Sequence, residues 1–523
     1  MKKLMLGLAV LVLATGVVFA EGQGEQAAGA KDTLVYATTE KVTDMDPANA
    51  YDFHTWEIFQ NVGRGLLAYK PGTTELIPGL ATDYEVNEAG DVYTFYLREG
   101  VKFSDGSEFT AEDVKWSIDR VMRLEGDPSW LVTSFVDNVE VVDKYTVRFN
   151  LQNPVGFFPN VVATVPYFPM NPEAYPADQW INDPSELEGG TLSGLGPYKI
   201  VSFKRDEEVI LEANENFYGD APNIDRIVIR YYADATTMRL ALENNEVDLV
   251  YKTLNPSDIE DLAANENYNT FELESPYIRY LCFETSESVF SDNELRQAVA
   301  ALIDRPEVSQ QVFFGQVDPL YSMVPEGMKF HTTDFKSELG DGNVELAEEI
   351  LSSKGYSASD PFEFELWYTP SHYGDTEVNL AEVLADQFEE TDMIDVSIKS
   401  AEWSTYTDSW DDKRMPAFLL GWYPDYLDPD NYTAAFAGTS GSAGMGIYFS
   451  DSEWDQLFRE EQSTPDQERR KEIFEQLQMM WTEQVPTAPI FQGKLYVFTQ
   501  PDVSGVKIGP SLIFNYDELE YTE

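Results

Sequence analysis

The chain has 523 residues, which is too long for a single hydrophobic core, so we expect two or three domains. Its formal net charge is −58, and such a field repels nucleic acid and anionic lipid headgroups, which excludes both as partners. Apolar residues make up 43% of the chain, which excludes global disorder. The single cysteine, Cys282, excludes an intrachain disulfide and is interpreted as a small core residue between two apolar neighbours.

The N-terminal segment has the three-part pattern of a secretory signal peptide. Two lysines precede an apolar run that begins at Leu4, and Ala20 ends a small-residue cleavage site. We therefore expect residues 1–20 to be a signal peptide and residues 21–31 to be a flexible tether. The apolar run is shorter than the roughly 20 residues of a membrane helix, but retention as an uncleaved anchor stays an alternative. No cysteine follows the run, so the sequence offers no lipid-anchor site there.

From Asp32 onward the pattern mixes strands and helices without a repeat. Tyr93 to Leu97 predicts a strand, and Thr110 with Asp113 predicts a capping box that opens a helix. Two alternating stretches around Asp143 predict a hairpin. The proline-rich segment 153–176 is interpreted as an ordered loop.

A β–α–β order is predicted in the middle of the chain. Arg226 to Tyr231 forms the first strand, Asp234 caps the helix, and Val247 to Val250 forms the second strand. The crossover is short, which favours parallel pairing of the two strands. The order therefore indicates an α/β fold.

Later helices have clear start signals. Asp292 is expected to cap one helix, Pro306 to lie in the first turn of the next, and Thr464 to Gln467 to begin a third. The glycine-rich run from Gly438 to Gly446 lacks the lysine of a phosphate-binding loop and follows no clear strand. We predict a flexible loop there.

The stretch from Gly421 to Asn431 is the best candidate for a binding site. It holds three aromatic residues, three carboxylates and two prolines within eleven residues. Aromatic walls and a stiff backbone around a carboxylate suit a ligand with a positive end, such as the α-ammonium of a peptide. The alternative is an ordinary acidic loop whose aromatic residues face the core.

No constellation of catalytic residues is found in the sequence. The three histidines, His54, His331 and His372, have no metal-ligand spacing, and no Gly-x-Ser-x-Gly motif occurs. We therefore predict no enzyme, no cofactor and no metal site. A glycosidase with paired carboxylates stays open, because 93 acidic residues form pairs by chance.

Five segments, in order, resemble family 5 extracellular solute-binding proteins, the peptide- and nickel-type receptors of ABC importers. They cover nearly all of the mature chain and comprise residues 93–123, 196–200, 214–250, 291–308 and 421–431. The resemblance implies an α/β, two-lobed periplasmic-binding-protein type II fold (cluster C) with an extra inserted subdomain. Lobe I would hold residues 32–71, 188–276 and 488–523, the inserted subdomain residues 72–187, and lobe II residues 277–487. The chain would cross between the lobes near Pro276 and near Pro486.

The resemblance also implies a function. The protein would be a periplasmic monomer that captures peptides between its lobes and delivers them to the membrane permease of an ABC transporter. Asp425 matches the residue that holds the ligand's ammonium, Trp422 and Tyr423 match the pocket wall, and Tyr51 would touch the ligand from lobe I. Two alternatives stay open: an oligosaccharide receptor of the same family, and a secreted glycosidase or peptidase.

Overall fold

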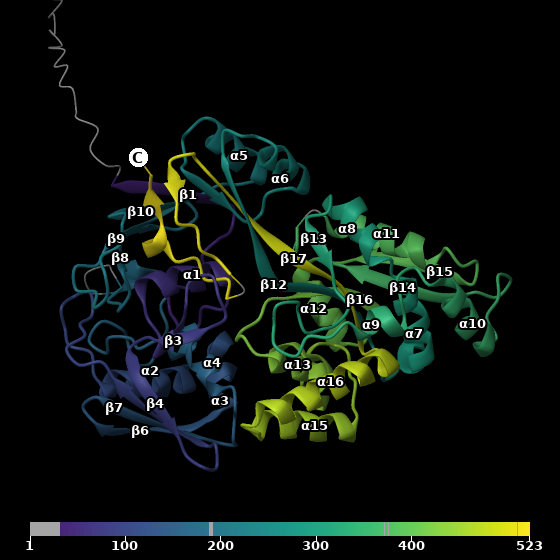
Figure 1. The fold of residues 1–523 in the computed structure, drawn as a ribbon, viewed down its shortest axis with the longest axis horizontal. Helices are drawn as coiled ribbons and strands as arrows, with labels where there is room; N and C mark the ends of the chain where they lie inside the picture. The colour runs from purple at the N-terminus through teal and green to yellow at the C-terminus, as the bar shows by residue number, and fades with distance from the viewer. Residues whose placement is uncertain (1–31, 188–191, 371, 375, 510, 523) are drawn as a thin grey trace, which may run out of the picture. The chain divides into compact units, whose positions relative to one another are not determined.

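The computed structural model describes residues 32–187, 192–370, 372–374, 376–509 and 511–522 (Figure 1). The predicted signal peptide and tether lie outside these residues. Residues 32–523 form one compact unit. Within the described part of the chain, no helix has both the length and the apolar character needed to span a bilayer.

A mixed sheet of eleven strands is the largest element among the described residues. β13 (Val317–Pro319) pairs with β17 but lies outside the consecutive order of the other ten strands. The other strands, in spatial order, are β15 (Ile394–Ser400), β14 (Phe362–Tyr368), β16 (Ala417–Trp422), β12 (Asn269–Phe283), β17 (Thr487–Thr499), β11 (Leu249–Tyr251), β1 (Thr33–Thr38), β10 (Arg226–Tyr231), β9 (Glu208–Ala213) and β8 (Tyr198–Lys204).

Two long antiparallel strands, β12 and β17, join two hydrophobic cores (Figure 1). Ile278 to Phe283 of β12 and Ala488 to Phe491 of β17 lie in one core, whereas Leu495 and Val497 lie in the other. The pairing register shifts between Glu274 and Ile278, and such irregularities bend a strand pair locally. Both strands therefore pass from one core to the other within their own length.

The first core includes a second, four-stranded sheet, β4 (Ala81–Val86), β5 (Val92–Leu97), β7 (Thr146–Leu151) and β6 (Val136–Asp143), with α2 (Ala111–Leu124) packed against it. This region confirms the predicted strand, helix and hairpin. The capping box is also confirmed, because the backbone N–H of Thr110 donates to Asp113 over 2.7 Å. The remaining elements of this core and its neighbouring helices are α1 (Phe53–Val62), β2 (Leu67–Tyr69), β3 (Leu76–Pro78), α3 (Trp130–Thr133), α4 (Phe158–Val162), α5 (Ala235–Glu243), α6 (Pro256–Ala263), β18 (Val503–Ser504) and β19 (Glu520–Tyr521).

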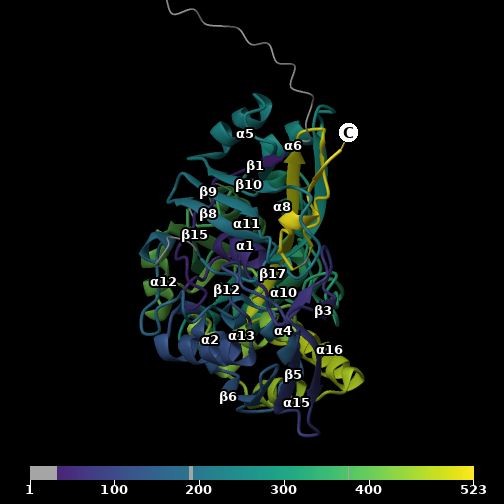
Figure 2. The same cartoon turned by 90° about the vertical axis from the view of Figure 1, so that its left-hand side faces the viewer.

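The second core is built on helices around β14, β15 and β16 (Figure 1). Asp292 caps the first of them, and its side chain accepts a hydrogen bond from the N–H of Glu294, as predicted. Pro306 lies in the first turn of the next, also as predicted. The helices are α7 (Asn293–Leu302), α8 (Arg305–Phe313), α9 (Asp334–Glu338), α10 (Val344–Lys354), α11 (Glu377–Phe388), α12 (Trp403–Asp411), α13 (Ala434–Ala437), α14 (Thr439–Gly444), α15 (Ser452–Ser463) and α16 (Gln467–Gln484). In the view turned by 90°, α15 and α16 lie towards the lower end of the compact unit (Figure 2).

The predicted pairing of the β–α–β unit is wrong in one respect. β10 and β11 run in the same direction, as expected, but β1 lies between them and pairs in parallel with both. The strand β1, from the N-terminal part of the chain, therefore separates two strands that the sequence order predicted to pair directly. Local sequence could not show this, because β1 precedes β10 by nearly two hundred residues.

The predicted flexible loop at Gly438 to Gly446 is also wrong, because α14 occupies most of it. A side chain at Gly441 would approach the carbonyl oxygen of Ala434 to 2.5 Å. Glycine is therefore required there by the close packing of α13 on α14, and not by flexibility. The segment 153–176, predicted as an ordered loop, contains the short helix α4.

Candidate ligand-binding site

A cavity of about 700 Å³ has walls from both cores. This volume lies within the range of ligand pockets in proteins. One wall comes from the ends of β1 and β11, and another from the segment that precedes α11. Gly493 to Tyr496 of β17 lie where that strand passes between the cores, and they line the cavity as well.

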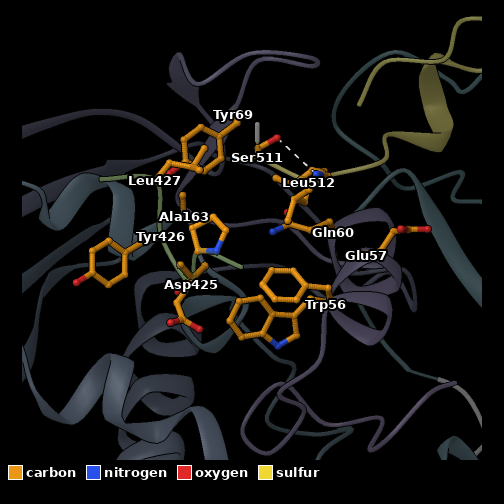
Figure 3. A pocket seen from close by; sticks show the side chains of 14 residues that line it. Trp56, Glu57, Gln60, Tyr69, Ala163, Asp425, Tyr426, Leu427, Ser511 and Leu512 are labelled. Carbon is orange, nitrogen blue, oxygen red and sulfur yellow. Dashed lines mark hydrogen bonds between the residues drawn. The ribbon is translucent and has the colours of Figure 1, made fainter. Parts of the chain in front are cut away.

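A second cavity, of about 40 Å³, is lined by Asp425 (Figure 3). A water needs only about 10–15 Å³ of such volume, so the space admits a group as small as an ammonium. Its other walls come from α1, from Tyr69 and from the C-terminal segment around Leu512. Of the predicted site residues, Asp425 lines this cavity and Tyr423 lines the larger one.

The Asp425 carboxylate is buried and has only neutral partners among the described residues. The residue is 7% exposed, and its carboxylate accepts a hydrogen bond from the hydroxyl of Tyr51 over 2.8 Å. The side-chain amide of Asn431 lies at the limit of hydrogen bonding, 3.5 Å away. Burial raises the pKa of Asp425 from its ordinary 3.8 to about 6. The arrangement leaves the carboxylate without a cation.

Asn431 holds the backbone of this loop in place. Its side-chain oxygen accepts hydrogen bonds from the backbone N–H of Asp425 and from the indole N–H of Trp422, both over 3.0 Å. The Trp422 indole also packs edge-on against Phe436, with ring centroids 5.2 Å apart. Trp422 is not among the residues that line the two cavities, and its role as a ligand wall stays a prediction.

Tyr423 joins the walls of the two cavities. Its ring lies 4.9 Å from that of Phe53, which lines the smaller cavity, and 4.4 Å from that of Tyr277, which lines the larger one. Glycines on the two neighbouring strands make room for Tyr277: a Cβ at Gly421 or at Gly493 would lie 2.8 Å from its ring. Tyr277 was not foreseen, because a single tyrosine in a buried strand carries no binding signal.

Tyr51 is supplied by the first core, directly before α1, whereas the Asp425 loop follows β16 of the second core. Tyr51 is 40% exposed, and its hydrogen bond to Asp425 links the two regions. The structure therefore brings Tyr51 and Asp425 together across 374 positions of sequence. That both contact a ligand stays a prediction.

Lys252, a largely buried lysine on the wall of the larger cavity, was not predicted from the sequence. The Lys252 ammonium lies 3.0 Å from Glu40 and 3.7 Å from Glu57. Burial opposes its charge, but Glu40 and other nearby acidic groups hold the pKa of Lys252 well above its ordinary value. Burial raises the pKa of Glu57 to about 7. Lys252 and Thr253 both have positive φ, +62° and +58°, a conformation that is uncommon for residues other than glycine and costs about 1–3 kcal/mol per residue.

The wall formed by the segment before α11 and by Glu377 carries a second ion pair. The Arg279 guanidinium forms a hydrogen bond with Glu377, which lines the cavity, and lies 3.9 Å from the ring centroid of Tyr373. Both charged side chains are nearly fully buried. Each charge has an opposite partner, although Nε and Nη1 of Arg279 have no hydrogen-bond partner among the described residues. The described residues contain no cluster of His, Cys, Asp and Glu that could hold a metal ion.

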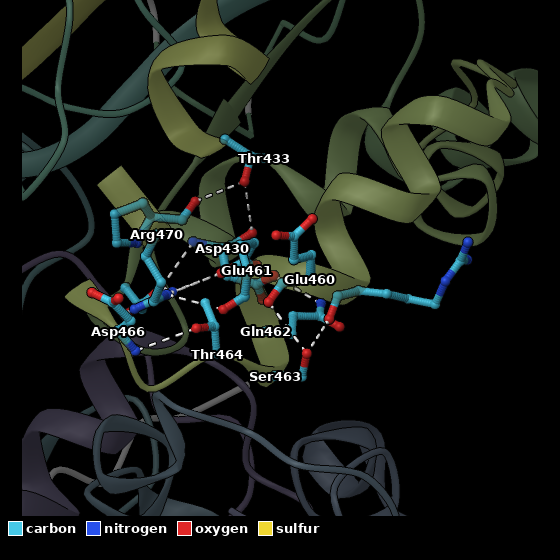
Figure 4. A network of polar contacts seen from close by, with 12 residues as sticks. Asp430, Thr433, Glu460, Glu461, Gln462, Ser463, Thr464, Asp466 and Arg470 are labelled. Atoms are coloured by element: carbon cyan, nitrogen blue, oxygen red, sulfur yellow. Dashed lines mark hydrogen bonds and ion pairs between the residues drawn. The ribbon is translucent and has the colours of Figure 1, made fainter. Parts of the chain in front are cut away.

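A polar network anchors the far end of the Asp425 loop (Figure 4). The guanidinium of Arg470 donates to both oxygens of Asp428, over 2.6 and 3.0 Å, and to Glu461 over 2.7 Å. Burial opposes the charge of Arg470, but the two carboxylates raise its pKa above the ordinary value. The backbone N–H of Gly156 donates to the carbonyl of Gln462 over 2.8 Å, which connects this network to the first core.

One sheet that passes through two cores, with a cavity between them, defines the architecture of a two-lobed solute-binding protein of the periplasmic type II class. The chain belongs to the bacterial extracellular solute-binding proteins of family 5: the family model described as "Bacterial extracellular solute-binding proteins, family 5 Middle" matches residues 75–444. The family assignment and the fold class predicted from the sequence are therefore confirmed.

Curated relatives match along nearly their whole length. The dipeptide-binding protein of Escherichia coli (strain K12) is 26% identical over 509 residues, which cover 91% of this chain and 92% of the relative. Heme-binding protein A of Haemophilus influenzae is 26% identical over 524 residues, which cover 95% of this chain and 93% of the relative.

Solved structures have the same fold. The substrate-binding protein CtaP of Listeria monocytogenes superposes with a TM-score of 0.83 at 22% identity, covering 95% of this chain and 100% of that one. The dipeptide-binding protein of Pseudoalteromonas sp. SM9913, in complex with Met-Leu, superposes with a TM-score of 0.78 at 23% identity, covering 94% and 100%.

Proposed function

We propose that this protein is the peptide-binding component of an ABC importer. It captures short peptides between its lobes in the periplasm and delivers them, chemically unaltered, to a membrane permease. The names of its relatives support peptides over oligosaccharides, since the Escherichia coli relative is a dipeptide-binding protein. The observation that carries the proposal is Asp425, a buried carboxylate without a cationic partner among the described residues, at a contact between the two cores.

In the proposed mechanism the ligand supplies the missing cation. The α-ammonium of the peptide enters the small cavity and forms charge-assisted hydrogen bonds with Asp425, which lower its pKa. Tyr423 and Tyr51 contact the ligand from the two cores, with Trp422 behind the loop. Only the closed arrangement presents both sets of contacts, so the ligand stabilises closure. The protein acts as a monomer and needs no cofactor.

The proposed lobes follow the two cores. The boundaries 32–71, 188–276 and 488–523 for lobe I, 72–187 for its inserted subdomain and 277–487 for lobe II remain a proposal. The core residues of β17 support a refinement of the last boundary, because Ala488 to Phe491 pack with the second core. The hinge would then lie at Gly493 in β17 and opposite the register shift in β12.

Calorimetry with Ala-Phe, N-acetyl-Ala-Phe and cellobiose tests the proposal. Wild-type protein should bind Ala-Phe, and Asp425→Ala should weaken that binding at least about tenfold, or about 1.4 kcal/mol. Acetylation removes the ammonium, so it should weaken binding to wild type and have little further effect on Asp425→Ala. Binding of cellobiose but of no peptide, or turnover of any of the three, would refute the proposal.

A further inference from the structure

The larger cavity contains a cation that the proposed ammonium site does not use. Lys252 lines this cavity, and its side chain is 12% exposed. A lysine ammonium has three N–H donors. One of them donates to Glu40 over 3.0 Å, whereas the 3.7 Å separation from Glu57 is too long for a hydrogen bond. Among the described residues, the other two donors of this largely buried cation therefore have no acceptor.

The backbone around Lys252 is held in an unusual conformation. Lys252 and the following Thr253 both lie in the left-handed region, which favours glycine. Both residues line the cavity. Two consecutive non-glycine residues of this kind persist only where surrounding contacts enforce them, and such positions cluster at ligand sites. The strained turn places Lys252 where it can face both Glu40 and the cavity.

The Lys252 site and the ammonium site are linked. Glu57 lies 3.7 Å from Lys252 and also lines the small cavity that holds Asp425. The aromatic pair of Phe53 and Tyr423 connects the same two cavities. The two cavities therefore adjoin, which brings a ligand with its ammonium at Asp425 next to a cavity that offers a cation.

We propose that Lys252 binds a carboxylate of the ligand, so that the receptor recognises peptides by a negative as well as a positive group. This inference rests on the proposed peptide-binding function. The carboxylate accepts hydrogen bonds from the two free N–H donors of Lys252, while Glu40 accepts the third. The source of the carboxylate is the peptide C-terminus or an acidic side chain.

Calorimetry with Ala-Phe and Ala-Phe amide tests the inference, because the two probes differ only in the C-terminal carboxylate. For wild-type protein the free acid should bind at least about tenfold tighter than the amide, equal to about 1.4 kcal/mol. Lys252→Met should reduce this ratio to about threefold or less, and Lys252→Arg should retain most of it. Ala-Glu amide that binds wild type tightly but not Lys252→Met would place the carboxylate on a side chain.

Lys354→Met is the matched control. Lys354 also has two carboxylate partners, Asp292 and Glu294, but it lies outside the cavity walls. Lys354→Met should leave the ratio of the affinities for Ala-Phe and Ala-Phe amide unchanged. If this variant lost the ratio as fully as Lys252→Met, the effect would be due to net charge and the inference would be overturned.

Glu40→Gln provides a test that does not depend on the folding of Lys252→Met. It removes the competing negative charge, so the preference for the free acid should stay or increase, and a loss would overturn the inference. An amide that binds wild type as tightly as the acid, without an Ala-Glu amide preference, would also overturn it and would leave the ammonium site intact. Equal binding of N-acetyl-Ala-Phe and Ala-Phe would instead refute the proposed function.

Discussion

Asp425 and Asp428 lie three positions apart in one loop and are buried to a similar degree, 7% and 5% exposed. Their partners differ. Asp428 shares two hydrogen bonds with Arg470, whereas the partners of Asp425 in the described part of the chain are the Tyr51 hydroxyl and the Asn431 amide. Burial alone therefore does not distinguish a structural carboxylate from a binding carboxylate. The charge of the partner does, because an unpaired buried carboxylate retains the capacity to bind a cation from outside.

The largest effect is expected from removing the cation that pairs with Asp428. Arg470→Met leaves Asp428 and Glu461 buried without their partner, which should lower the free energy of unfolding by about 3–5 kcal/mol. Arg469→Met is the control, since Arg469 forms exposed ion pairs worth less than about 1 kcal/mol. Urea denaturation measures both, and equal effects of the two variants would contradict the structural role of Arg470.

The pH dependence of the free energy of unfolding should show that the charge of Asp425, unlike that of Asp428, has no cationic partner. Because its folded-state pKa is raised from 3.8 to about 6, its stabilising contribution is complete below about pH 4 and is lost as the pH rises through 6, by about 3 kcal/mol in total. Asp425→Asn should lack this loss. The difference between the two urea-denaturation curves, measured without ligand from pH 4 to 8, isolates the effect from the other carboxylates.

Peptide affinity should have the opposite pH dependence. A protonated Asp425 cannot pair with an ammonium, so binding of Ala-Phe should strengthen as the pH rises from 5 to 7. A difference curve that is flat, together with pH-independent binding, would remove Asp425 from the mechanism.

The smallest effect concerns the neutral partner of Asp425. The Tyr51 hydrogen bond lowers the pKa of Asp425 against the effect of burial, so Tyr51→Phe should raise that pKa further. The loss of one such hydrogen bond is worth about 1 kcal/mol. Calorimetric titrations with Ala-Phe should show the midpoint of the pH profile moving to higher pH, and an unchanged midpoint would show that Tyr51 does not influence the carboxylate.

Local sequence signals predicted much of the fold. Asp292, Pro306 and Asp234 mark helix starts because capping and proline geometry act within a few residues. The pairing of β1 between β10 and β11 and the helix at Gly438 to Gly446 were missed. Both depend on packing against segments that local patterns do not include.

The candidate site likewise has features that the sequence predicted and features that only the structure showed. The stretch around Asp425 was found from its aromatic residues and carboxylates, but residue types could not separate Asp425 from Asp428. Lys252 carried no signal, because its importance comes from Glu40, 212 positions away, and from a cavity wall. A lone lysine in a sequence is ordinarily a solvated surface residue.

The sequence by itself determined the helix starts and the stretch from Gly421 to Asn431, since these follow from composition and short-range spacing, and five of its segments carried the resemblance to the family. Only the tertiary structure decided which buried charges are paired. The physical reason is that a carboxylate's partner is set by distance in space: Tyr51 reaches Asp425 across 374 positions, and Arg470 reaches Asp428 across 42.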